Sequence, residues 1–180
     1  PQVIDDNGKQ LTVGGLERIA SVAGKIRNRV DGALLLSSGD DLIPPLFSIF
    51  HGDPEMRAMS LAGYDIVAPG NHEFDLGAKT YKDALSFATF PLVSANLIVD
   101  DQKLQDRILT YVIKNIGEIK VGVFGMMNPD FLEVCSPGDG TTVDQNIMSV
   151  AQKAVDSLLK EKCDLIIALT HIGIELDRQL

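Results

Sequence analysis

The chain has 180 residues and a formal net charge of −9 at pH 7; 45% of its residues are hydrophobic and 23% are charged. This length and composition suit one globular domain, residues 1–180, with a core of its own. The negative charge disfavours nucleic acid and anionic membrane surfaces as partners, because both attract basic surfaces. No apolar run is long enough to cross a bilayer, and no signal peptide is visible in a chain that begins at Pro1.

Helices and strands are predicted to alternate. In chain order, apolar spacing and turn residues predict a helix (11–30), a buried strand (32–38), a helix interrupted at Pro54 (46–64), a strand (65–70), a helix (78–88), a strand (90–97), two strands joined at Gly117-Glu118 (109–126), an amphipathic helix (146–162) and a strand (164–173). The Gly117-Glu118 turn favours an antiparallel hairpin. This alternation predicts an α/β fold with a mainly parallel, helix-covered sheet and either a mixed edge or a second sheet.

Three of the predicted strands end in polar residues that suit a reactive site. They are followed by Gly39-Asp40, by GNHE at Gly70–Glu73 and by Thr170-His171. Ligands of open α/β sheets bind beyond the carboxyl ends of the strands, so we expect these side chains to meet at one rim of one sheet. A carboxylate, an amide and two imidazoles are metal ligands or proton-transfer groups.

Each of these residues also has a purely structural interpretation. Asp40 could cap the segment that follows it, His72 could be a hydrogen-bonded loop residue, and His171 could belong to the core at a strand end. The remaining histidine, His51, lacks polar neighbours of this kind and is expected at a helix end or on the surface. The two cysteines show no metal-binding spacing, and Cys163 is expected to be a buried free thiol.

The polar motifs resemble those of a known family. Gly39-Asp40, GNHE and THIG (Thr170–Gly173) are similar to successive motifs of the calcineurin-like metallophosphoesterases. The strings AGYDIVAPGNHEFDLG, FPLVSANL and GGLERIA resemble the 5'-nucleotidase branch, which includes UDP-sugar hydrolases and 2',3'-cyclic nucleotide phosphodiesterases. The similarity extends over almost the whole chain.

This resemblance implies the family's αββα four-layer sandwich and metal-dependent hydrolysis of a small-molecule phosphate ester, first of all a nucleoside monophosphate. The alternatives are a cyclic nucleotide phosphodiesterase, a nucleotide-sugar hydrolase and a non-catalytic binding module that retains the fold. In the family two divalent cations, which Zn, Mn, Mg or Fe can supply, share a bridging aspartate that Asp40 matches. Asn71 and His171 match ligands of the second metal. His72 matches the catalytic histidine, with Asp75 as its orienting partner.

The resemblance also implies that residues outside this chain complete the site. The family's Asp-x-His motif is expected before Pro1 and its Gly-His-x-His motif after Leu180, so the fold is expected to be incomplete at both ends and the chain alone weakly active. An unpaired sheet edge is then expected to allow self-association. The family relationship leans towards a periplasmic or extracellular location.

Overall fold

Two sheets stacked face to face form the centre of the molecule. The computed structural model describes residues 2–4, 6–12, 14–138 and 140–180. One sheet is entirely parallel and has the order β3 (Leu36–Ser37), β4 (Ile66–Val67), β5 (Leu92–Val93) and β7 (Ile108–Leu109). The other has the order β11 (Leu165–His171), β9 (Ile119–Met127) and β8 (Tyr111–Ile116), with β11 parallel and β8 antiparallel to β9.

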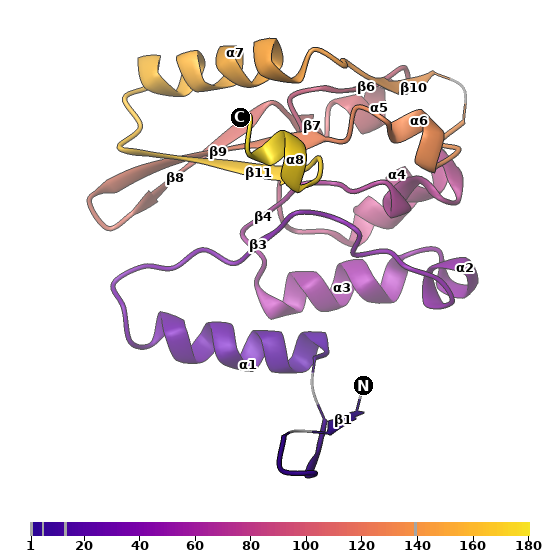
Figure 1. Cartoon of the computed structure of the whole chain (residues 1–180), viewed down its shortest axis with the longest axis vertical. Helices are drawn as coiled ribbons and strands as arrows, with labels where there is room; N and C mark the ends of the chain where they lie inside the picture. The colour runs from indigo at the N-terminus through magenta and orange to yellow at the C-terminus, as the bar shows by residue number, and fades with distance from the viewer. Residues whose placement is uncertain (1, 5, 13, 139) are drawn as a thin grey trace.

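Helices cover the outer faces of both sheets (Figure 1). The four-stranded sheet is covered by α1 (Leu16–Arg27), α3 (Asp53–Ala62) and α4 (Gly77–Ala84). The three-stranded sheet is covered by α7 (Ile147–Lys160), whose buried residues pack on Phe124 and Met126 of β9. Both faces of β9 are therefore buried, which explains its long apolar run. This arrangement confirms the αββα class predicted from the resemblance.

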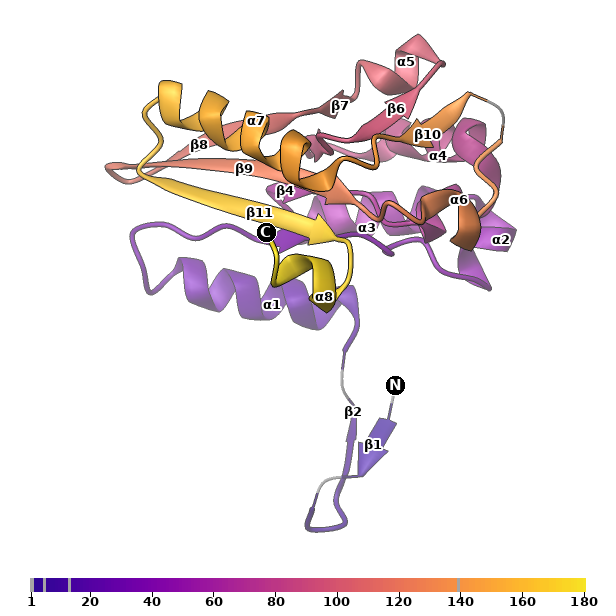
Figure 2. The ribbon, with the colours of Figure 1, turned by 45° about the horizontal axis from the view of Figure 1, so that its top comes forward.

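Short elements connect these layers. They are α2 (Leu46–Phe50), η1 (His72–Phe74), η2 (Leu85–Phe87), α5 (Gln102–Gln105), α6 (Phe131–Val134) and α8 (Ile174–Asp177). Two antiparallel pairs stand apart from the main sheets: β1 (Gln2–Ile4) with β2 (Gln10–Thr12), and β6 (Leu97–Val99) with β10 (Thr141–Val143). The β1–β2 pair projects away from the layers in both views (Figure 2). Within the described ranges, no helix is both long and apolar enough to span a bilayer.

The contact between the two sheets is apolar and close. Ile66, Ala68 and Val93 on one side form a buried cluster with Val121 and Val123 on the other. The approach is closest at a glycine of β9, where a Cβ atom would overlap with the backbone carbonyl of Val93. The relative position of the sheets is therefore fixed by side-chain packing and by one glycine.

The first predicted helix begins later than expected. The prediction placed its start at residue 11, but Gln10–Thr12 form β2 and α1 begins at Leu16. Gly14 and Gly15, with φ of 71° and 90°, adopt left-handed conformations that a right-handed helix does not contain. The strand predicted over 32–38 is likewise shorter, because only Leu36 and Ser37 pair with β4.

The second predicted helix is interrupted, but not at Pro54. Helix α2 ends at His51 and Gly52, which have φ of 54° and 87°. Pro54 lies in the first turn of α3, where its missing N–H removes no hydrogen bond. His51 is exposed at this helix end, as expected. The hairpin at Gly117-Glu118 is confirmed, whereas Cys163 is free but only half-buried rather than buried.

Two glycine substitutions test the sheet contact. We expect Gly125→Ala to lower the free energy of unfolding by about 1–3 kcal/mol, because the added methyl group forces the sheets apart. Gly24→Ala is the matched control: it lies inside α1 with no heavy atom within 4 Å of its would-be Cβ, and should stabilise by about 0.5–1 kcal/mol. Urea unfolding followed by circular dichroism measures both. Equal stability of the two variants would contradict this description of the contact.

Candidate metal centre and acid–base pair

The three polar strand exits come together at one edge of the stacked sheets. Nε2 of His171 lies 3.2 Å from Oδ1 of Asn71 and 3.4 Å from Oδ2 of Asp40. The prediction that all three follow strands of one sheet is wrong. Asp40 and Asn71 follow β3 and β4, but His171 ends β11 in the other sheet. They meet because β11 lies over the four-stranded sheet with its carboxyl end at the same edge.

Glycines make this close approach possible. A Cβ atom at Gly39 would overlap with the backbone of Gly70, and one at Gly70 would overlap with the Asp40 carboxylate and lie 2.9 Å from Cε1 of His171. Asp40 itself has a φ of 58°, in the left-handed region that few non-glycine residues adopt. Backbone strain of this kind persists where surrounding contacts hold it, as at functional sites.

Hydrogen bonding sets the proton on the His171 ring. Nδ1 lies 2.8 Å from the carbonyl oxygen of Ser38, which only accepts, so Nδ1 carries the hydrogen. In the neutral ring, Nε2 then presents a lone pair towards Asn71 and Asp40. The amide oxygen and the carboxylate oxygen that face it are acceptors as well. Three electron-pair donors therefore point into one place.

This donor set fits a divalent cation. One imidazole nitrogen, one carboxylate oxygen and one amide oxygen suit borderline and hard metals, and a backbone carbonyl behind the imidazole is a common support of metal-ligating histidine. A Cβ at Gly70 would fill part of the space between the donors. In the described part of the chain, no three His, Cys, Asp or Glu residues form a group that could hold a metal, so Asn71 supplies the third donor here.

His72 and Asp75 form a separate pair beside this cluster. Nδ1 of His72 lies 2.6 Å from Oδ2 of Asp75, across the single turn of η1. This hydrogen bond raises the pKa of His72 above its ordinary value of 6.5, with a smaller contribution from the charge of Asp40, while partial burial lowers it. The backbone N–H of His72 donates to Oδ1 of Asp40 at 3.1 Å, which ties the pair to the cluster.

Sequence reasoning gave no role to Glu73, although it is the most buried acidic residue of the site, at 2% exposure. Its Oε1 accepts from the N–H groups of Asp41 (2.6 Å) and Leu42 (3.0 Å), and its Oε2 from those of Asp40 (3.0 Å) and Gly70 (2.6 Å). Burial raises its pKa to about 7, and the charge of Asp41 acts in the same direction, whereas the N–H donors lower it. An acid placed directly after Asn-His in a short turn was the available signal.

The thiol nearest the site is not poised for nucleophilic chemistry. Cys135 interacts electrostatically with Asp75 and Asp40. Burial raises its pKa to about 11, and both carboxylates add to this, so the thiol stays protonated at neutral pH. Its Sγ contacts the carbonyl oxygen of Phe131 at 3.3 Å. The nucleophile for any reaction at this site therefore does not come from Cys135.

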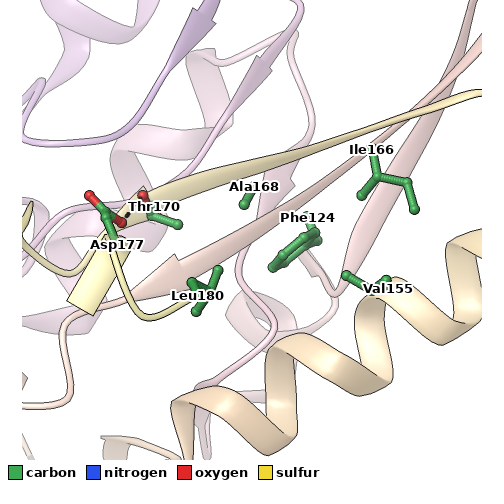
Figure 3. A pocket seen from close by; sticks show the side chains of 7 residues that line it. All are labelled: Phe124, Val155, Ile166, Ala168, Thr170, Asp177 and Leu180. Atoms are coloured by element: carbon green, nitrogen blue, oxygen red, sulfur yellow. Dashed lines mark hydrogen bonds between the residues drawn. The ribbon is translucent and has the colours of Figure 1, made fainter.

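A hollow of about 470 Å³ lies elsewhere, between β11, α7 and α8 (Figure 3). Its lining is mostly apolar, and its polar members Thr170 and Asp177 bond to each other at 2.7 Å. Neither His171 nor Asp40 lines it. The cluster of potential ligands is thus an open surface site at the sheet edge and not part of this hollow.

Known proteins share this fold and much of the sequence. No family model matches the chain. The 5'-nucleotidase of Bos taurus is 32% identical over 186 residues, which cover 98% of this chain and 32% of that protein. The crystal structure of a 5'-nucleotidase precursor from Thermus thermophilus matches 99% of this chain and 35% of its own with a TM-score of 0.92 and 30% identity.

A further crystal structure, the calcineurin-like phosphoesterase YfkN from Bacillus subtilis, matches 93% of this chain and 57% of its own with a TM-score of 0.73 and 25% identity. The fold and the rim are therefore those of a phosphoesterase domain. The chain belongs to the 5'-nucleotidase family of calcineurin-like phosphoesterases, whose members are divalent-metal enzymes. It spans about a third of the length of the curated relatives that it matches.

The His72–Asp75 hydrogen bond makes a prediction for metal-free protein. Titration of the His72 ring, followed by NMR, should give a pKa above 6.5, because Asp75 favours the imidazolium. Asp75→Asn should lower it. Asp83→Asn, which removes the same charge from the exposed face of α4, should leave it unchanged. A His72 pKa that does not respond to Asp75→Asn would show that the pair is not formed in solution.

Proposed function

We propose that Asp40, Asn71 and His171 bind a divalent metal ion and that His72, with Asp75, is the acid–base group of a phosphate-ester hydrolase. The observation that carries the proposal is the convergence of Nε2 of His171 on Oδ1 of Asn71 and Oδ2 of Asp40, with Nδ1 committed to the Ser38 carbonyl. Acceptors crowded together at 3.2 and 3.4 Å repel one another unless a cation or proton lies between them.

Bound divalent metal supplies an activated water and stabilises the negative charge of the phosphoryl oxygens. The side chains of this chain do the rest. Asp75 holds the His72 ring through Nδ1, which leaves Nε2 directed away from Asp75. In its protonated form that ring can stabilise a phosphoryl oxygen or deliver a proton to the departing alkoxide. The raised pKa of His72 keeps more of the ring protonated at neutral pH.

The substrate that we propose is a nucleoside 5'-monophosphate, hydrolysed to nucleoside and phosphate. Support comes from relatives named 5'-nucleotidase that match nearly the whole chain. The cluster lies on an open rim, so the described residues provide for the phosphate and leave the rest of the ligand in contact with other surfaces. AMP, a UDP-sugar, a 2',3'-cyclic nucleotide and an aryl phosphate, assayed side by side with Mn²⁺, distinguish the candidate substrates from one another.

Substitution of His72 separates catalysis from metal binding. His72→Ala should reduce kcat by roughly 10²–10⁴ while metal content stays near that of the wild type, because His72 is not among the proposed ligands. His51→Asn is the control, since His51 is exposed at the end of α2 with a left-handed φ that asparagine tolerates. Metal loss in His72→Ala would overturn this division of roles.

Substitution of His171 tests the ligand assignment. His171→Ala should weaken Mn²⁺ binding by at least about tenfold, because it removes one of three protein donors. Electron paramagnetic resonance of free Mn²⁺ during a titration measures the affinity directly. If His171→Ala and wild-type protein bind Mn²⁺ equally, the metal lies elsewhere and the proposed centre is wrong.

A further inference from the structure

One buried carboxylate joins the two loops that carry Asp40 and Asn71. Glu73 accepts from three successive N–H groups of the loop after β3, those of Asp40, Asp41 and Leu42, and from the N–H of Gly70 after β4. The loops are separated by about thirty positions in the sequence but are held by the same side chain. Each of its two oxygens accepts two hydrogen bonds.

We infer that Glu73 is a positioning residue, whose carboxylate holds the Asp40 and Asn71 loops in ligand geometry before any metal binds. Hydrogen bonds from N–H groups to a buried carboxylate are stronger than those between neutral groups, so the four together resist loop opening. The left-handed φ of Asp40, 58°, is held by the N–H bonds on either side of its peptide unit. The inference rests on the proposed function only in taking Asp40 and Asn71 as ligands.

Glutamine is the informative replacement. Glu73→Gln keeps size and shape, but one oxygen becomes an NH₂ group that faces two N–H donors instead of accepting from them. The loops should then open more often. Asp65→Asn is the matched control: Asp65 accepts from the N–H of Leu35 and from Arg27, both at 2.7 Å, and so joins the starts of β3 and β4 at the end of the sheet opposite the site.

Two measurements on the purified protein decide the inference. The first is amide hydrogen exchange without metal: Glu73→Gln should speed exchange at Asp40, Asp41, Leu42 and Gly70, whereas Asp65→Asn should not. The second is Mn²⁺ affinity, which should fall by roughly 10–100-fold in Glu73→Gln and stay at the wild-type value in Asp65→Asn. A residue with a merely structural role would lower the melting temperature in both variants and leave Mn²⁺ affinity unchanged.

The outcomes separate this inference from the proposed function. If wild-type protein fails to bind Mn²⁺ but Glu73→Gln speeds exchange at the four amides, the clamp stands and the metal centre falls. If the four amides exchange alike in both proteins, the clamp is wrong whatever the metal does. If Glu73→Gln does not fold, the wild type decides: the four amides lie outside every helix and strand, so protection there supports the clamp, and exchange at free-loop rates overturns it.

Discussion

The candidate site depends on how the two sheets pack against each other, because Asp40 and Asn71 come from one sheet and His171 from the other. The buried cluster of Ile66, Ala68 and Val93 with Val121 and Val123 sets the spacing of the sheets. The parallel pairing of β11 with β9 then places the carboxyl end of β11 above the exits of β3 and β4. A site of three side chains is thus assembled by apolar contacts that are not themselves polar or reactive.

The rim uses its backbone as carefully as its side chains. Glycines 39 and 70 allow the β3 and β4 exits to approach without overlap, and the Ser38 carbonyl fixes the tautomer of His171. The ligand atoms are therefore oriented by groups that never touch a substrate. Division of labour follows from this arrangement: His171 points its lone pair at the acceptor cluster, whereas His72 turns its Nδ1 to Asp75.

Local sequence signals predicted the parts of the site but not how they assemble. The exits at Asp40, Asn71 and His171 were recognisable because each polar residue directly follows an apolar strand. The sheet to which β11 belongs was not, since short buried strands of either sheet look alike in sequence. The role of Glu73 was missed for a related reason: three of its four donors lie about thirty residues away, and no local pattern encodes such a contact. Family resemblance, not periodicity, supplied the functional assignments.

The central claim is that three acceptor atoms from two sheets converge to hold one divalent cation. A crystal of the protein soaked in Mn²⁺, with data collected near the manganese absorption edge, tests this most directly. The account predicts an anomalous difference peak within bonding distance of Oδ2 of Asp40, Oδ1 of Asn71 and Nε2 of His171. A peak bound by other side chains, or none at this rim in protein saturated with Mn²⁺, would contradict it.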